Sequence, residues 1–212
     1  PEPRNFKITD MHLGEGGTKA KFRANMNAIA TLKQVEAEGR TATPEEQEIL
    51  SQYVGWGGIP DVFDPKKKEW AKEYKELDGA LTPEEYASAR LSTLNAHYTS
   101  PSVIKAIYQA ITRMGFRSGR ILEPACGIGN FFGLLPEEMS QSKLYGVELD
   151  DISGRIAKLL YPHAQIHITG YEKADLQKDF FDLAIGNVPF GQYQVNDPEY
   201  NHLKFSIHNY FI

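Results

Sequence analysis

The chain has 212 residues, of which 41% are hydrophobic and 24% are charged, with a formal net charge of -5 at pH 7. This composition is typical of a globular, cytoplasmic protein: no run of about 18 apolar residues predicts a membrane span, and no charged-then-apolar leader predicts secretion. The single cysteine, Cys126, excludes an internal disulfide and a cysteine-cluster zinc site, and the six histidines form no metal-binding pattern. Because the net charge is negative, most of the contacts to any bound nucleic acid are expected to come from outside this chain.

The first part of the chain, residues 1–95, is predicted to be a helical region. Thr43-Pro44-Glu45-Glu46 and Thr82-Pro83-Glu84-Glu85 each supply an N-cap hydroxyl, a proline at the first helical position and a glutamate at the third. Apolar residues at helical spacing follow both, and similar stretches run over 24–38 and 65–77.

A glycine-rich stretch, Gly55-Trp56-Gly57-Gly58-Ile59-Pro60, lies between two of these helices. It could present Trp56 to a ligand or to DNA, or it could be a turn whose tryptophan anchors it on the core. We favour the anchored turn, because three glycines suffice for a tight turn and buried tryptophan is common. The short basic run at 66–68 is read as a solvated helical turn rather than a phosphate contact.

From residue 96 the pattern predicts an α/β fold with a parallel sheet, Rossmann-like. Ser100-Pro101 opens a helix that ends at Gly115 and carries its apolar residues on one face: Val103, Ile104, Ile107, Tyr108 and Ile111. Strand-like runs over 120–123, 143–148, 164–169 and 181–186 then alternate with helical runs over 130–135 and 151–161. Ligands in such sheets bind at the carboxyl ends of the strands.

The first predicted strand runs into a glycine loop, 123–133, with sequence EPACGIGNFFG. Gly127 and Gly129 allow backbone to approach a ligand where a side chain would collide. Glu123 precedes the position of a pyrophosphate and would repel it, so a cofactor with a cationic amino-acid moiety and no phosphate fits better. S-adenosylmethionine has these properties.

The second predicted strand ends in an acid, Glu148, about 20 residues beyond the glycines, where a carboxylate can accept hydrogen bonds from both ribose hydroxyls. Acids after strands are also common helix N-caps, and Asp150 or Asp151 is expected to serve as one.

The fourth predicted strand, read as buried, leads into Asn187-Val188-Pro189-Phe190. An amide oxygen, a backbone carbonyl and an aromatic face are the groups needed to hold a planar exocyclic amine for attack. The same residues also occur in ordinary turns, with Asn187 capping the turn and Phe190 packed under the sheet edge. The upstream cofactor loop favours the catalytic interpretation.

Together these residues resemble the amino-methylating DNA methyltransferases, in particular the N6-adenine enzymes related to the modification subunits of type I restriction systems. The resemblance covers residues 97–212 and implies an S-adenosylmethionine-dependent methyltransferase fold in which Asn187, Val188, Pro189 and Phe190 are catalytic. The family usually has Asn-Pro-Pro-Tyr or Asn-Pro-Pro-Phe there. Val188 replaces a residue that acts through its main-chain carbonyl, which valine keeps.

The resemblance also implies a set of cofactor-binding residues. His97-Tyr98-Thr99-Ser100-Pro101 is similar to the family's Tyr-Thr-Pro element, which touches the methionine part of the cofactor, although here a serine precedes the proline. Glu172, with Asp175 as second choice, is expected near the adenine ring and amine. The full set is Tyr98, Thr99, Glu123, Ala125, Gly127, Gly129, Asn130, Phe131, Glu148, Leu149 and Glu172, and no metal ligand is expected.

Several alternatives remain open at this stage. Cys126 could be a nucleophile, but no base is placed beside it, and a small residue in a glycine turn is favoured. Tyr98 and Phe132 are read as core rather than cofactor-stacking residues. The target amine could belong to adenine, cytosine or a protein glutamine, or the unit could be a silent domain that binds DNA or partners.

The glycine-rich stretches and the Gly-Asn-Val-Pro-Phe-Gly version of the tetrapeptide are most similar to the methylase segment of very large methylase-helicase proteins of conjugative elements and phages. We therefore expect residues 96–212 to be a partial methyltransferase domain within a longer protein. The missing parts would be the last strands of the sheet, target-recognition elements and a helicase, with DNA as the partner. Modification, antirestriction and transfer of a mobile element all stay open as the biological role.

Overall fold

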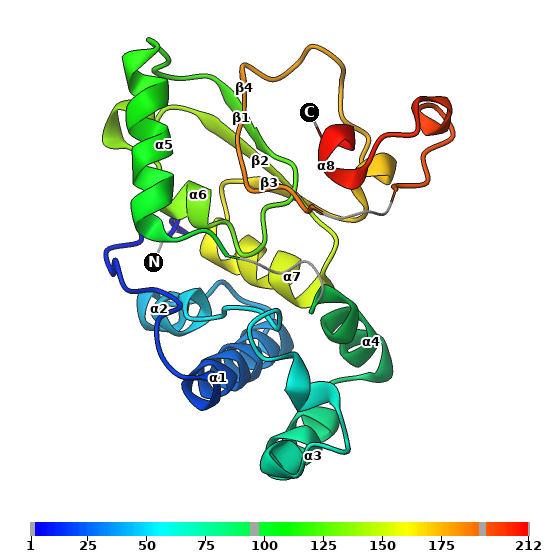
Figure 1. Ribbon diagram of the computed structural model, residues 1–212. Coiled ribbons are helices and arrows are strands. Elements are labelled where there is room, and N and C mark those ends of the chain that lie inside the picture. Colours follow the sequence, from blue (N-terminus) through cyan, green and yellow to red (C-terminus); the bar gives the residue numbers. More distant parts are fainter. Residues whose placement is uncertain (1–2, 94–97, 191–193, 212) are drawn as a thin grey trace.

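The computed structural model describes residues 3–93, 98–190 and 194–211. Residues 18–92 form helices joined by loops, drawn in blue to green in the lower half of Figure 1. Four are α-helices, α1 (Thr18–Ala37), α2 (Pro44–Ser51), α3 (Ala71–Ala80) and α4 (Pro83–Ser92), and two are short 3-10 helices, η1 (Pro60–Phe63) and η2 (Lys68–Trp70).

Both predicted capping boxes are confirmed. In α2 the Thr43 hydroxyl accepts a hydrogen bond from the Glu46 amide at 3.3 Å, and the Glu46 carboxylate accepts from the Thr43 amide at 2.8 Å. In α4 the pair Thr82 and Glu85 repeats this exchange at 3.2 and 2.9 Å. These reciprocal bonds satisfy amides that a helix start would otherwise leave unpaired, and they fix where each helix begins.

The loop that follows α2 is anchored on the helical core, as favoured from the sequence. Trp56 is fully buried, and its ring meets the ring of Phe63 edge-on at 5.4 Å. Asn25, a buried side chain of α1, donates to the Gly55 carbonyl at 2.6 Å and accepts from the Val54 amide at 2.9 Å. The loop is therefore held by an aromatic cluster on one side and by an amide clamp on the other.

The rest of the described chain is an α/β unit with a parallel sheet in the order β3-β2-β1-β4, a Rossmann-like arrangement. Its strands are β1 (Arg120–Glu123), β2 (Lys143–Glu148), β3 (Gln165–Ile168) and β4 (Leu183–Ala184). Its α-helices are α5 (Pro101–Arg113), α6 (Asn130–Gly133), α7 (Asp151–Leu160) and α8 (Ile207–Tyr210), and its 3-10 helices are η3 (Glu137–Met139), η4 (Tyr171–Lys173) and η5 (Asn201–Leu203).

The two faces of the sheet are covered differently. Ile121 and Leu144 belong to the main hydrophobic cluster together with apolar residues of α5, α6 and α7. On the opposite face, Leu122, Tyr145 and Val147 are covered by side chains of the segment 171–181. Because strand side chains alternate, Glu123 and Glu148 share the helix-covered face with Ile121 and Leu144.

Two expectations from the sequence are wrong in detail. Val103 does not share the buried face of α5; it is 48% exposed, because it lies beside Ile104 and only the latter faces the sheet. The fourth strand is not a buried run. It pairs with β1 through two residues, Leu183 and Ala184, and within the described residues it forms an edge of the sheet, where Ala184 is exposed.

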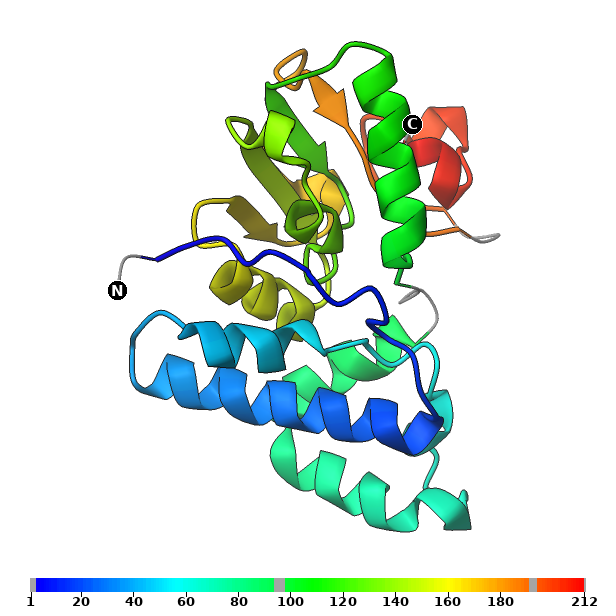
Figure 2. The same ribbon diagram turned by 90° about the vertical axis from the view of Figure 1, so that its left-hand side faces the viewer.

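The helical region and the α/β unit are joined by residues 3–8, which cross between them in Figure 2. The Phe6 amide donates to the Leu160 carbonyl at 2.7 Å, and the Ile8 amide donates to the Gly133 carbonyl at 2.9 Å. One hydrophobic cluster includes residues of both parts. The division near residue 95 stays a prediction, since residues 94–97 lie outside those described.

An ion network ties α7 to the helical region. Arg155 contacts carboxylates of three segments: Glu36 in α1, Glu85 in α4 at 2.7 Å and Asp151 in α7 at 2.7 Å. Lys33 of α1 also pairs with Glu85 at 2.6 Å. The Glu85 side chain is 8% exposed, so this acid is a buried hub with two basic partners.

Candidate active site at the carboxyl edge of the sheet

The predicted site residues come from loops that leave the carboxyl ends of neighbouring strands. The sheet is parallel, so the segments after β1, β2, β3 and β4 emerge at the same edge. The loop after β1 is central, because β1 pairs with β2 on one side and with β4 on the other.

Two positions of the glycine loop, Gly127 and Gly129, require glycine. Gly127 has φ +55° and Gly129 has φ +84°, a left-handed region that side chains rarely adopt. A Cβ atom on Gly129 would lie 2.6 Å from a ring carbon of Tyr161, and one on Gly127 would lie 3.2 Å from a ring carbon of Tyr98. The Cys126 amide donates to the Val147 carbonyl at 2.9 Å, which holds the loop against β2.

Glu148 joins the end of β2 to this loop. One carboxylate oxygen accepts from the Gly127 amide at 2.6 Å and the other accepts from the Asp150 amide at 2.7 Å. Burial raises the pKa of Glu148 to about 7. Each oxygen keeps a second lone pair, so the carboxylate can still accept from a ligand hydroxyl.

Glu123 ends β1 as a buried acid. Its side chain is 3% exposed, and one oxygen, Oε2, has no hydrogen-bond partner within the described residues. Burial, and then the charge of Glu148, raise the pKa of Glu123 well above its usual range. Two acids thus lie on one face at the strand ends, where a cationic ligand would lower their pKa values and favour their ionised forms.

Asp150 is the N-cap of α7, as expected. Its carboxylate accepts from the Ser153 amide at 2.9 Å and from the Ser153 hydroxyl at 2.6 Å. The Ser153 hydroxyl lies 3.4 Å from the Tyr98 hydroxyl, which ties Tyr98 to the start of α7. Tyr98 is half-buried and packs on the core while its ring contacts the glycine loop, so it is a core residue at the wall of the site.

The other predicted cofactor-binding residues differ in how exposed their side chains are. Thr99, Ala125 and Asn130 are half-buried, and Leu149 is 74% exposed directly after β2. Glu172 lies in η4 after β3, with its carboxylate folded back against Gly170. These residues leave surface on which a ligand could lie.

Phe131 does not fit the cofactor role for its side chain. It is 2% exposed, and its ring packs edge-on against Tyr108 at 6.3 Å, while the Tyr108 hydroxyl donates to the Phe131 carbonyl at 2.9 Å. The ring faces α5, because it lies on the inner side of α6. Phe132 is buried at 4% exposure, as expected for a core residue.

The surroundings of Cys126 do not suit a nucleophile. It is 4% exposed, and burial raises the pKa of its thiol well above the usual range. A protonated, buried thiol is unreactive, so the interpretation as a small residue in a glycine turn holds.

The predicted catalytic tetrapeptide follows β4, near the start of the glycine loop. A Cβ atom on Gly186, the residue before it, would lie 3.4 Å from Glu123 Cγ and 3.6 Å from Pro124 Cδ. Asn187 is exposed, Val188 and Pro189 are half-buried, and Phe190 is 62% exposed. Phe190 is therefore not packed under the sheet edge, and its ring is largely accessible at the carboxyl edge.

A cavity of about 390 Å³ adjoins the glycine loop and was not predicted from the sequence. Tyr98, Thr99 and Asn130 line it, but its other walls come from residues 11–15, Lys21 and the Gly55–Ile59 loop. These segments are distant in sequence, so no local motif could have revealed that they meet.

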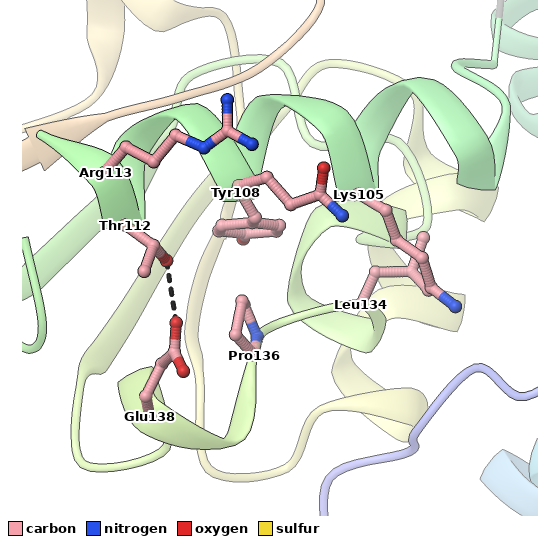
Figure 3. A pocket seen from close by; sticks show the side chains of 8 residues that line it. Lys105, Tyr108, Thr112, Arg113, Leu134, Pro136 and Glu138 are labelled. Atoms are coloured by element: carbon pink, nitrogen blue, oxygen red, sulfur yellow. Dashed lines mark hydrogen bonds between the residues drawn. The ribbon is translucent and has the colours of Figure 1, made fainter.

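A second hollow, of about 410 Å³, is separate from these residues. Figure 3 shows it between α5 and the segment after α6, where the Thr112 hydroxyl donates to Glu138 at 2.8 Å. None of the predicted site residues lines it. We therefore assign the candidate site to the carboxyl edge of the sheet and not to this hollow.

The fold is an α/β Rossmann-like unit, and its candidate site combines an acidic strand end, a glycine loop and a second acid at one edge of the sheet. Within the described ranges no group of three or more His, Cys, Asp or Glu side chains could hold a metal ion. Among the helices described, none has the length and apolar character needed to cross a membrane.

No family model matches the chain. It is 26% identical over 180 residues to the Defense against restriction protein B of Escherichia phage P1, an alignment that covers 84% of this chain and 6% of that protein. Among solved structures, a modification subunit assigned to a type I restriction enzyme of Vibrio vulnificus YJ016 is 14% identical, with a TM-score of 0.38, over 84% of this chain and 55% of the other. The chain therefore spans a small fraction of the curated relative it matches.

Proposed function

We propose that this chain is a segment of an S-adenosylmethionine-dependent DNA methyltransferase that transfers a methyl group to the N6 amine of a flipped adenine. The observation that carries the proposal is that Gly186, the residue before Asn187-Val188-Pro189-Phe190, lies beside the Glu123 end of β1, next to a glycine loop held by Glu148. The similarity to a phage protein named for defense against restriction supports a setting in restriction and modification.

The residues present fit such a cofactor. The buried Glu123 Oε2 has no partner within the described chain, so it can meet a cationic group, and it disfavours the phosphates of a dinucleotide. Glu148 is placed to accept from ribose hydroxyls, and the exposed Leu149 can cover one face of an adenine ring. Glu172 would contact the far end of that ring, and Tyr98 and Thr99 the methionine end.

S-adenosylmethionine, when bound, supplies a methyl group on a sulfonium that leaves readily. The chain's own residues would position the acceptor. The Asn187 side-chain oxygen and the Val188 carbonyl would accept the two N-H bonds of the amine, drawing its lone pair out of conjugation with the ring. Pro189 fixes the direction of the Val188 carbonyl, and the accessible Phe190 ring would stack on the flipped base.

The test is methyl transfer from labelled S-adenosylmethionine to DNA by the 212-residue chain, with and without Asn187→Ala. We expect Asn187→Ala to abolish transfer and to leave cofactor affinity within about twofold, because the amide contacts the acceptor and not the donor. Asn27→Ala, an exposed asparagine of α1, is the matched control and should change neither quantity.

The acceptor is settled by comparing DNA with adenine as the only amino base, DNA with cytosine as the only amino base, and protein. Transfer to adenine-free DNA or to protein glutamine would replace the adenine assignment. Unchanged turnover in Asn187→Ala would contradict the catalytic role of the tetrapeptide. Failure of the chain to bind S-adenosylmethionine in calorimetry would indicate a silent binding domain.

A further inference from the structure

The cavity beside the glycine loop contains a lysine with no counter-charge. Lys21 lies in the first turns of α1, is half-buried and lines the cavity. Within the described residues its ammonium makes no ion pair or side-chain hydrogen bond. Its neighbours in α1 differ: Lys19 pairs with Glu73 at 2.8 Å and Arg23 pairs with Glu76 on α3. Lys21 alone of these three is directed to the cavity.

The fold holds Lys21 at this place. Residues four apart lie on one face of a helix, so Lys21 and Asn25 both face the Gly55 loop. Asn25 clamps that loop, and the Lys21 ammonium lies beside Gly58, 3.9 Å from where its Cβ would be. Tyr53, which lines the same cavity, is 1% exposed, and its hydroxyl has no partner within the described chain.

The opposite wall belongs to the candidate site. Tyr98, Thr99 and Ser100 contribute hydroxyl groups, and Asn130 follows the second glycine of the loop. The acid at the rim, Glu15, contacts His12 at 3.0 Å and is exposed. The cavity thus combines an unpaired ammonium and hydroxyl donors on the side of the site where the methionine end of the cofactor is proposed to lie.

We propose that Lys21, supplied by the helical region, binds the carboxylate of the cofactor's amino-acid moiety in this cavity. The inference rests on the proposed function and deepens it, since it makes α1 and the Gly55 loop a wall of the methyl-donor site. A half-buried ammonium gains more from a small bound anion than from solvent, and a hydrogen bond to a charged group is stronger than a neutral one.

The experiment compares two donors that differ by one group: S-adenosylmethionine and decarboxylated S-adenosylmethionine, which lacks only the carboxylate. Affinities are measured by calorimetry for the unmodified chain, Lys21→Met, Lys21→Arg and the control Lys19→Met. We expect Lys21→Met to weaken S-adenosylmethionine binding about tenfold and to leave the decarboxylated compound unchanged. Lys21→Arg should recover most of the loss, and Lys19→Met should bind as the unmodified chain does.

The outcomes separate this inference from the proposed function. The role of Lys21 is refuted, and the methyl-donor site stands, in two cases. In the first, Lys21→Met binds S-adenosylmethionine as tightly as the unmodified chain does. In the second, Lys21→Met loses affinity for both donors by the same factor. If Lys21→Met weakens binding of a DNA duplex and not of the donor, Lys21 contacts a backbone phosphate and the inference is wrong. If the unmodified chain binds neither donor, the proposed function fails and the inference fails with it.

Discussion

Replacing the buried hub Glu85 by glutamine should destabilise the fold by an amount that depends on pH. Hydrogen bonds from Lys33 and Arg155, opposed by burial, lower the pKa of Glu85 from 4.5 to about 2. A carboxylate whose pKa is lower in the folded state than in the unfolded state stabilises the protein at pH values above its unfolded pKa. This stabilisation is lost as the pH falls toward the folded pKa. Each pKa unit corresponds to about 1.4 kcal/mol, so the charge contributes about 3 kcal/mol at neutral pH and about 1 kcal/mol near pH 3.

The Glu85→Gln change removes the negative charge but keeps the capping box, because the glutamine amide oxygen can still accept from the Thr82 amide. Glu84→Gln is the matched control: Glu84 is exposed in the same helical turn, and its replacement should cost less than about 1 kcal/mol. Urea unfolding of both variants at neutral pH and near pH 3 gives the free energies of unfolding. Equal losses in the two variants, or a loss in Glu85→Gln that does not shrink with falling pH, would refute the reasoning.

Two further changes probe the site itself. Gly129→Ala should lower the free energy of unfolding by about 2 to 4 kcal/mol, since its Cβ would lie 2.6 Å from the Tyr161 ring at φ +84°, whereas Gly79→Ala in α3 meets nothing within 4 Å and should not destabilise; equal unfolding midpoints would contradict this. If Glu148 binds the ribose as proposed, affinity for S-adenosylmethionine should fall about tenfold between about pH 8 and pH 6, because burial raises the pKa of Glu148 to about 7 and only its ionised form would accept from both hydroxyls. Calorimetry on Glu148→Gln should show no such pH dependence, and pH-independent binding by the unmodified chain would exclude the role.

The sequence predicted those elements whose signals are local. The bounds of β1 and β2 match the predicted ranges 120–123 and 143–148, because each strand is a short apolar run ended by an acid. Both capping boxes start helices where expected, since the participating side chains are three residues apart. Asp150 caps α7 for the same reason.

Features set by distant contacts were not predictable. The fourth strand looked buried because its apolar run is continuous, but its exposure depends on its place at a sheet edge, which only the strand order shows. Phe131 was expected at the cofactor, but its ring faces inward because α5 packs against α6. The cavity with Lys21 is lined by five segments that are separate in the sequence, so its recognition required the tertiary structure.

The crossing segment near the start of the chain has a consequence for how such a protein can be exchanged between genomes. Phe6 and Ile8 occupy hydrogen bonds at Leu160 and Gly133, on the sheet's own helices, although they precede the helical region in the gene. A recombination event that took only the sheet would leave those carbonyls and the adjoining apolar surface without their cover. We therefore expect a transferred gene segment to keep these contacts only if it encodes the crossing segment together with the sheet and its helices.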